Sequence, residues 1–250
     1  MNDRAGPKVA FVTGAGSGIG RAAATAFVRR GYATVLADVN SDAGKAAQVE
    51  LEADGTCSFV HCDVTDDDSV REAVAHAVAS FGRLDAAFNA AGIDGEHGRP
   101  TAEATMENWA NVLAVDLTGT FSCMRHELPA IVESGGGSIV NCASVAGLRA
   151  AATMSAYTAA KHGVVGLTKA AAVEYARAGV RINAICPGTV DTPMFRASMP
   201  TQLVDRLVRT NPVGRLAEAD EIAEVAVWLC DDATAYLTGQ AITVDGGASA

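Results

Sequence analysis

The sequence predicts an α/β fold in which one parallel sheet carries helices on both faces. Short apolar runs typical of buried strands alternate with helical stretches seven times along the chain. No Pro/Ser-rich linker or charge block divides the 250 residues, and 49% of them are hydrophobic, which suffices for one large core. We therefore expect a doubly wound, three-layer arrangement with a seven-stranded parallel sheet, formed by a single domain over residues 1–250.

The individual elements follow from apolar runs and turn residues. We expect strands at residues 8–12, 33–39, 57–62, 84–88, 138–142, 180–186 and 241–244. We expect helices after the first glycine-rich turn and at residues 41–53, 65–81, 103–131 and 217–230, and one that carries Tyr157 and Lys161 over about 152–178. Proline and glycine residues break regular structure near residue 188. The segment that follows, at about 189–216, is expected to form a short helix and a mobile substrate lid.

Charge and composition exclude several classes of function. The net charge of −10 argues against binding of nucleic acids or anionic membranes, because both need basic patches. The first eight residues lack an apolar signal region, and no apolar run approaches about 18 residues, so we expect no transmembrane helix. Six cysteines without CxxC spacing indicate a reducing, cytoplasmic compartment, and the five histidines show no metal-ligand spacing.

A glycine-rich turn follows the first expected strand. Residues 13–20 read Thr-Gly-Ala-Gly-Ser-Gly-Ile-Gly and lead into an alanine-rich helix. Glycines let the backbone turn sharply and approach a pyrophosphate, and a helix N-terminus offers free N–H groups to it. This order of strand, turn and helix predicts a dinucleotide cradle.

Asp38 ends the second expected strand, 18 residues after Gly20. A carboxylate at this distance is suited to hydrogen bonding with the adenosine ribose hydroxyls. It repels a 2′-phosphate, and the flanking Val39 and Asn40 offer no cation to bind one. We therefore expect NAD rather than NADP as the cofactor.

Tyr157 and Lys161 stand four residues apart in an alanine-rich helical stretch. Positions i and i+4 share one face of a helix, so the phenol and the ammonium lie side by side. A neighbouring positive charge favours the ionised phenol, so we expect the pKa of Tyr157 to fall. A tyrosine that ionises more readily is suited to general acid or base catalysis.

Four separated motifs now agree in order and in position. They are Thr13-Gly14-x-x-x-Gly18-Ile19-Gly20, Asn89-Ala90-Ala91-Gly92, Ser144 with Tyr157-x-x-x-Lys161, and Pro187-Gly188 with Thr192. Together they resemble the short-chain dehydrogenase/reductase family over nearly the whole chain. The resemblance implies a Rossmann-like fold that transfers hydride between a nicotinamide dinucleotide and an alcohol or carbonyl.

The same resemblance implies roles for individual residues. It implies Tyr157 as the acid/base, Lys161 as a clamp on the nicotinamide ribose that lowers the tyrosine pKa, and Ser144 as the hydroxyl that orients the substrate oxygen. It implies that the cofactor is bound by Tyr157 and Lys161 together with Gly14, Ser17, Gly18, Ile19, Gly20, Asp38, Asp63, Val64, Asn89, Ala90, Gly92, Pro187, Gly188, Val190 and Thr192.

Asp116 departs from the family pattern, which usually has Asn in this place. That Asn supports a water that links the lysine to solvent. An ionised Asp accepts hydrogen bonds but donates none. We expect Asp116 to pair with Lys161, to offset part of its effect on the tyrosine, and to shift the pH optimum without abolishing activity.

The substrate is less closely defined. We expect pocket walls from residues 93–97, 145–154 and 189–199, with Ser144, Asp94, Met154 and Met194 as substrate contacts. Flexible methionines suit an apolar, adaptable surface. The expected substrate is a secondary alcohol, such as a cyclic or aromatic-derived diol, oxidised with NAD.

Two other functions remain open from the sequence. One is a carbonyl reductase of the 3-oxoacyl-[acyl-carrier-protein] type, which prefers NADPH and a basic surface. The other is a dinucleotide-binding regulator without turnover, which only Asp116 favours. Small residues on the helices near 103–131 and 152–178 permit close packing, and in the resembled family these helices build dimers that pair into tetramers, so we expect a homotetramer.

Overall fold

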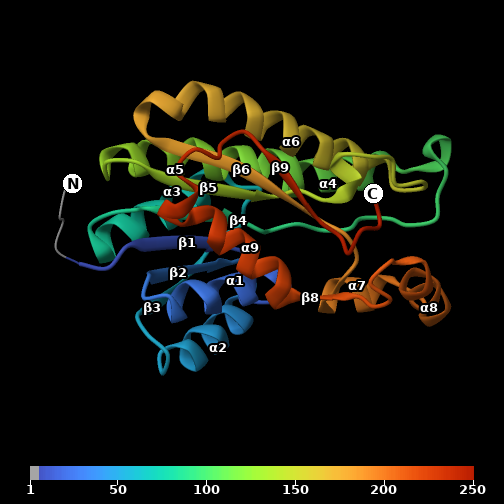
Figure 1. Cartoon of the computed structure of the whole chain (residues 1–250), viewed down its shortest axis with the longest axis horizontal. Helices are drawn as coiled ribbons and strands as arrows, with labels where there is room; N and C mark the ends of the chain where they lie inside the picture. Colours follow the sequence, from blue (N-terminus) through green and yellow to red (C-terminus); the bar gives the residue numbers. More distant parts are fainter. Residues whose placement is uncertain (1–5) are drawn as a thin grey trace.

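The computed structural model describes residues 6–250, so the first five residues, at the N-terminus where no signal region is expected, lie outside it. Seven parallel strands form the central sheet in the order β3-β2-β1-β4-β5-β6-β9 (Figure 1). In that order they are β3 (Cys57–His61), β2 (Ala33–Asp38), β1 (Val9–Thr13), β4 (Ala86–Asn89), β5 (Gly137–Cys142), β6 (Val180–Pro187) and β9 (Ala241–Val244). The predicted fold class is confirmed.

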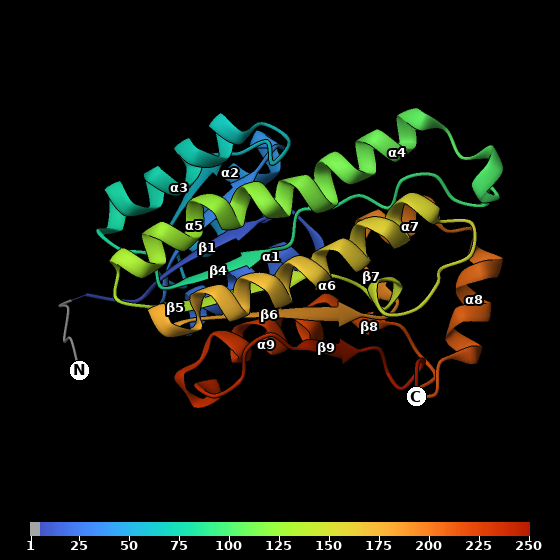
Figure 2. The same ribbon diagram turned by 90° about the horizontal axis from the view of Figure 1, so that it is seen from above.

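Helices cover both faces of this sheet (Figures 1 and 2). One layer contains α1 (Gly18–Arg29), α2 (Ser41–Leu51) and α9 (Ala219–Cys230), and the other contains α3 (Asp67–Phe81), α5 (Thr120–Glu133) and α6 (Ser155–Tyr175). Successive strand side chains point to opposite faces. Phe11 therefore packs into the core under α3 and α5, whereas Val12 packs into the core under α1 and α9.

The long helical stretch expected at residues 103–131 is helical without a gap from Met106, but it is not a uniform α-helix. It consists of a short 3₁₀ turn η1 (Thr101–Glu103), α4 (Met106–Val112), a π-helical segment η2 (Leu113–Gly119) and α5. The Thr120 hydroxyl donates a hydrogen bond to the Asp116 backbone carbonyl oxygen at 2.8 Å. This carbonyl lies in the π-helical segment, where the backbone hydrogen bonds are shifted, and the hydroxyl gives it a donor. π-Helical segments are rare and frequent at functional sites, and this one carries Asp116.

Residues 189–216 lie beyond the C-terminal ends of the strands (Figure 2). They contain β7 (Val190–Asp191), α7 (Pro193–Ser198) and α8 (Thr201–Thr210), and β7 pairs in parallel with β8 (Ala217–Glu218). Thr192 caps α7, because its hydroxyl accepts a hydrogen bond from the Phe195 N–H at 3.2 Å. The remaining 3₁₀ turns are η3 (Val145–Gly147), η4 (Ala176–Ala178) and η5 (Asp232–Thr234).

Within residues 6–250, none of the helices has both the length and the apolar character needed to cross a bilayer.

Candidate active site

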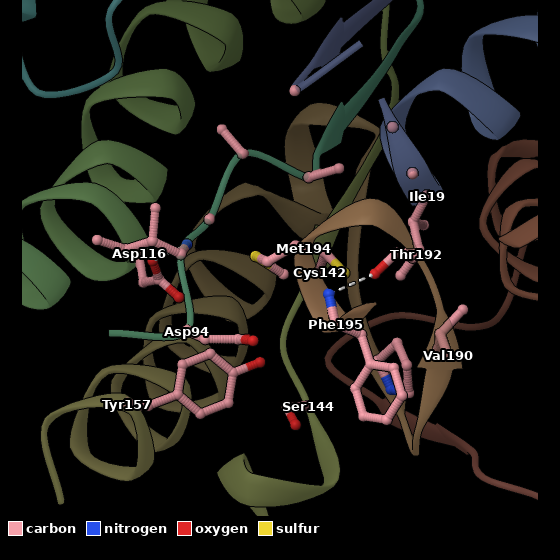
Figure 3. Close-up of a pocket in the computed structure, with 18 of the residues that line it drawn as sticks. Ile19, Asp94, Asp116, Cys142, Ser144, Tyr157, Val190, Thr192, Met194 and Phe195 are labelled. Atoms are coloured by element: carbon pink, nitrogen blue, oxygen red, sulfur yellow. Dashed lines mark hydrogen bonds between the residues drawn. The ribbon is translucent and has the colours of Figure 1, made fainter. Parts of the chain in front are cut away.

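A cavity of about 580 Å³ opens at the C-terminal ends of the strands, between the sheet and the α7–α8 segment (Figure 3). Strands β1 and β4 are neighbours here although β2 and β3 intervene in the chain, which creates the crevice where ligands bind in open α/β sheets. Its size suits a small-molecule or cofactor site.

The cavity brings together nearly all of the residues that the sequence singled out. Its walls include Gly14, Ser17, Gly18, Ile19, Gly20, Asp38, Asp63, Val64, Ala90, Gly92, Asp94, Asp116, Ser144, Met154, Tyr157, Lys161, Pro187, Gly188, Val190, Thr192 and Met194. In the part of the chain that the structure describes, no three His, Cys, Asp or Glu side chains gather in a metal-type cluster.

Asn89 is the exception, because it does not line the cavity. Its side chain is 3% exposed, and its amide nitrogen donates to Glu127 Oε2 and to Asn141 Oδ1, both at 3.0 Å. The last residue of β4 therefore points into the core, where it joins β4 to β5 and α5. That Asn89 lies near the adenosine ribose stays a prediction, and its side-chain amide nitrogen is already occupied in the core.

The glycine-rich turn has no room for a side chain at Gly14 or Gly20. Gly14 has φ +66°, and a Cβ there would lie 3.0 Å from the Ala91 backbone nitrogen. A Cβ on Gly20 would collide with the Gly14 carbonyl oxygen. The bare backbone and the N-terminus of α1 therefore form a concave surface that faces the cavity. This cradle fits a dinucleotide pyrophosphate, which accepts hydrogen bonds from free backbone N–H groups.

Asp38 holds the outer end of the cradle. Its Oδ2 accepts a hydrogen bond from the Gly16 N–H, and its Oδ1 accepts one from the Asn40 N–H, both at 2.8 Å. Lys161 is the only lysine or arginine among the described residues that line the cavity, and it lies at the opposite end. The cradle end therefore presents a carboxylate and no cation.

The loop after β4 is tied to the loop after β1. The N–H groups of Ala90 and Ala91 donate to the Thr13 hydroxyl, at 3.0 and 3.2 Å. Near the cradle, the Thr65 hydroxyl donates to Asp63 Oδ1 at 2.7 Å and lowers the pKa of that carboxyl. Asp63 therefore faces the cavity in its ionised form.

Ser144, Tyr157 and Lys161 gather at the inner end of the cavity. Ser144 follows β5, and its hydroxyl accepts a hydrogen bond from the Ala146 N–H at 3.1 Å. Tyr157 and Lys161 share one face of α6, and Lys161 Nζ lies 5.4 Å from the centre of the tyrosine ring. Lys161 also donates to the Cys142 carbonyl oxygen at 3.1 Å. The helix is thereby anchored to the end of β5, where Ser144 emerges.

The pKa of Tyr157 does not fall as expected. Burial raises it to about 12, because an ionised phenol loses its hydration in this cavity. Lys161 and a hydrogen bond with Ser144 lower the pKa, while the negative charge of Asp116 raises it again. The expectation of a lowered pKa is wrong for the protein without a ligand, since it counted the lysine and not the burial.

Asp116 projects from the π-helical segment into the same corner. Its Oδ2 lies 3.0 Å from Lys161 Nζ, and its Oδ1 accepts a hydrogen bond from the Ile93 N–H at 2.9 Å. Burial raises the pKa of Asp116, opposed by Lys161 and the Ile93 N–H. Burial lowers the pKa of Lys161, but Asp116 and Tyr157 outweigh it and raise the pKa overall. We treat the two as an ion pair, because each charge compensates the burial of the other.

The outer part of this end is mostly apolar. Met154, Met194 and Phe195, all within the expected pocket walls, line it together with Leu207 of the segment expected to cover the site. Cys142, at the end of β5, is a cavity residue that sequence reasoning did not single out, and its only signal was its position at the end of a strand. Arg149, within the expected pocket wall at 145–154, donates instead to the Ala248 carbonyl oxygen and is exposed.

Comparisons with known proteins show which proteins the chain is similar to. Residues 14–249 match the family model described as enoyl-(acyl carrier protein) reductase. The chain is 42% identical to 2,5-dichloro-2,5-cyclohexadiene-1,4-diol dehydrogenase from Sphingobium indicum, over 100% of both chains. It is 41% identical to cyclohexanol dehydrogenase from Acinetobacter sp., over 98% of this chain and 96% of that one. The crystal structure of a variant of actinorhodin polyketide ketoreductase with NADPH superposes with a TM-score of 0.92, at 34% identity over 97% of both chains.

The fold and the cavity define an oxidoreductase that binds a nicotinamide dinucleotide beside an alcohol or ketone. The chain belongs to the short-chain dehydrogenase/reductase family.

Proposed function

We propose that this enzyme oxidises a cyclic secondary alcohol to its ketone with NAD, with Tyr157 as the acid/base. The observation that carries the proposal is the layout of the cavity. One end presents Ser144, Tyr157 and Lys161 around a mostly apolar space, and the other presents a glycine cradle beside Asp38. A substrate oxygen and a dinucleotide fit the two ends of this one cavity.

The proposed mechanism assigns a task to each side chain. The bound dinucleotide supplies the redox chemistry, the exchange of a hydride with the substrate carbon. Ionised Tyr157 takes the proton of the substrate hydroxyl during oxidation and returns it to the oxygen during reduction. Ser144 donates a hydrogen bond to the same oxygen and fixes its position. Lys161, with its buried positive charge, stabilises the tyrosinate and binds the nicotinamide ribose.

NAD is proposed over NADP because of the charges at the cradle end. A 2′-phosphate there meets the Asp38 carboxylate, and no described lysine or arginine lines that end of the cavity. We propose that Asp38 accepts hydrogen bonds from the ribose hydroxyls. The Gly cradle, Asp63, Val64, Ala90 and Gly92 complete the proposed adenosine half, and Pro187, Gly188, Val190 and Thr192 the nicotinamide half.

A ring alcohol is proposed because of the walls and the relatives. Met154, Met194 and Met199 offer an apolar and adaptable surface, which suits a saturated or partly unsaturated ring. Two relatives of similar length carry names that specify cyclohexane or cyclohexadiene alcohols. We propose that the segment at 189–216 acts as the lid over this substrate.

A second candidate is an NADPH-dependent reductase of the 3-oxoacyl-[acyl-carrier-protein] type. The description of the matched family model and the NADPH in the ketoreductase structure favour it. Asp38 and the net charge of −10 disfavour it, because an acidic carrier protein binds a basic surface. A regulator without turnover is disfavoured by the conjunction of Ser144, Tyr157 and Lys161.

We further propose a homotetramer in the cytoplasm. Large apolar side chains are exposed on α4, α5 and α6, among them Met106, Phe121 and Val173, and Trp228 and Tyr236 are exposed on another part of the surface. Two such surfaces support two kinds of subunit contact. The six free cysteines support a reducing compartment. Light scattering of the purified protein measures the number of subunits directly.

The function is tested with a panel of cyclic secondary alcohols and ketones, using NAD(H) and NADP(H) and the absorbance of the reduced nicotinamide. We expect turnover of ring alcohols with NAD. Tyr157→Phe should lose at least about a thousandfold in kcat while it still binds NADH, because it removes only the proton acceptor. Turnover of the phenylalanine variant at the parent rate refutes Tyr157 as the acid/base. Preferred use of NADPH with acyl-carrier substrates supports the second candidate.

A further inference from the structure

The apolar end of the cavity contains one pair of polar side chains that the proposed chemistry does not use. Asp94 and His97, three residues apart in the loop after β4, both line it. Their side chains are only 17% and 21% exposed. Figure 3 shows the Asp94 carboxylate directed toward the part of the cavity that the Tyr157 hydroxyl also faces.

The loop that carries this pair is held from behind by α4. The Glu96 N–H donates to Asn108 Oδ1 at 2.8 Å, and the Thr105 hydroxyl donates to Glu96 Oε1 at 3.1 Å. Gly95 adopts φ +69°, which turns the chain between Asp94 and Glu96. The side chain of Glu96 is thus directed to the helix, while Asp94 and His97 remain on the cavity side.

The hydrogen bonding of the pair is incomplete. Asp94 Oδ2 accepts a hydrogen bond from the Ser198 hydroxyl of α7 at 3.0 Å and lies 3.6 Å from His97 Nε2. His97 Nε2 is buried and has no hydrogen-bond partner among the described residues. Asp94 Oδ1 likewise receives no hydrogen bond from the part of the chain that the structure describes. Buried polar atoms are normally paired, so the unpartnered ring nitrogen of His97 is unusual. The Asp94 carboxylate beside it lines the cavity and is the group left for a ligand.

A ring that carries a single oxygen leaves both atoms unpaired once its oxygen occupies Ser144 and Tyr157. Closure of an apolar ligand over Asp94 Oδ1 also removes water from that oxygen, which weakens binding. A second hydroxyl on the ring corrects this defect, because it donates to Asp94 Oδ1, and it then lies beside His97. A carboxylate is a strong acceptor for such a hydroxyl.

We propose that Asp94 and His97 form a subsite for a second hydroxyl group, so that the preferred substrate is a cyclic diol rather than a ring with one hydroxyl. This inference rests on the proposed function and deepens it. Since Oδ2 of the same carboxylate binds Ser198, the subsite also connects the bound diol to α7 in the segment that covers the cavity.

The test compares cyclohexanol with the 1,2- and 1,4-cyclohexanediols as substrates of the parent enzyme, Asp94→Ala and Glu96→Gln. We expect the parent to favour at least one diol in kcat/KM. The ratio of kcat/KM for that diol to kcat/KM for cyclohexanol should fall about tenfold or more in Asp94→Ala, as expected when a hydrogen bond to a charged group is lost. Glu96→Gln removes a charge from the same loop outside the cavity and should leave the ratio unchanged.

A binding measurement separates this inference from the proposed function. Calorimetry on Tyr157→Phe with NADH, which needs no turnover, should give a tighter Kd for that diol than for cyclohexanol, and Asp94→Ala in this background should equalise the two. Equal binding of the alcohols to Tyr157→Phe, or a ratio unchanged by Asp94→Ala, overturns the subsite. If no alcohol is oxidised but the diol still binds more tightly through Asp94, the subsite holds and the proposed function fails.

Discussion

Asp116 Oδ2 lies 3.0 Å from Lys161 Nζ, and the two side chains are 0% and 6% exposed. The pair joins the π-helical segment η2 to α6 immediately behind Tyr157. The pair lowers the tyrosine pKa less than a lone lysine would, since the negative charge of Asp116 raises that pKa and offsets part of the lysine's effect. The departure from the family's usual Asn therefore acts on the proposed acid/base itself.

Asp116→Asn should make alcohol oxidation faster near neutral pH. Oxidation needs ionised Tyr157, and burial raises its pKa to about 12, so the parent rate should increase with pH from neutral into the alkaline range. Removal of the Asp116 charge lowers the tyrosine pKa and moves this rising limb toward lower pH. We expect a several-fold gain in kcat/KM at pH 7, measured in a pH–rate profile.

The control for this prediction is Asp63→Asn, which removes a cavity carboxylate that is not among the charges raising the pKa of Tyr157. The rise of kcat/KM for alcohol oxidation with pH should be the same in Asp63→Asn as in the parent. Ketone reduction uses protonated Tyr157, so it should decline at lower pH in Asp116→Asn than in the parent. If the pH–rate profiles of the parent and of Asp116→Asn coincide, Asp116 does not influence the ionisation of Tyr157.

The sequence was sufficient for the sheet and for the cradle, because both depend on local signals. Apolar runs and glycine-rich turns identified all seven strands, and the chain order of parallel strands brings their loops to one edge. The sequence was not sufficient to predict the π-helical segment η2. A π-helical segment differs from an α-helix by one residue in the spacing of its hydrogen bonds, and over the seven residues of η2 this difference is too small for apolar periodicity to show.

Asp38→Asn tests the cofactor proposal. The asparagine keeps an oxygen that can accept from the Gly16 N–H, so the cradle should retain its shape while its charge is lost. We expect the ratio of kcat/KM with NADP to kcat/KM with NAD to rise about tenfold, as one removed charge permits. Asp63→Asn serves again as the matched control, because it removes the other carboxylate near the cradle. A ratio that responds equally to both variants contradicts a specific role for Asp38.

Burial was the quantity that sequence reasoning estimated least well. Strands buried on both faces show no alternation of polar and apolar residues, so nothing in the motif indicated that Asn89 points into the core. For Tyr157, the spacing to Lys161 gave the neighbouring charge but not the loss of hydration. Both depend on how distant segments cover a residue.

Glu127 should make the protein less stable at alkaline pH. Its side chain is 0% exposed, burial raises its pKa to about 8 although the Asn89 amide opposes this, and Oε1 has no hydrogen-bond partner among the described residues. A raised carboxyl pKa means that the folded state holds a proton that the unfolded state has released. The stability from this group is therefore fully present below the ordinary pKa of 4.5 and is lost as the pH rises from there through 8.

Glu127→Gln should remove this loss. We expect it to exceed the parent in unfolding free energy at pH 9 by a few kcal/mol, and to match it more closely at pH 5. Urea unfolding at the two pH values measures the difference. Glu174→Gln, an exposed position on α6, is the control and should follow the parent at both. A parallel decline of Glu127→Gln and the parent shows that another group is responsible.

Gly95→Ala should damage the substrate end of the cavity and spare the cofactor end. At φ +69° an alanine is strained by about 1 kcal/mol, and its Cβ would also lie 2.5 Å from Asn108 Oδ1 and from Val112 Cγ2. Because Asn108 Oδ1 also accepts the Glu96 N–H, relief of this clash through Asn108 disturbs the anchor of the loop that carries Asp94. We expect a several-fold higher KM for ring alcohols, an unchanged Kd for NADH, and a Tm lower by several degrees.

Gly98 offers a matched control for the clash. It has φ +81°, but a Cβ there meets nothing within 4 Å. Gly98→Ala should therefore cost only the backbone strain, about 1 kcal/mol, which corresponds to roughly 2–4 °C in Tm for a chain of this size. Its KM should stay at the parent value, because no contact moves the loop. If KM changes equally in Gly95→Ala and Gly98→Ala, backbone strain alone disturbs the site. If the two variants have equal Tm values, α4 yields to the added methyl group without displacing Asp94.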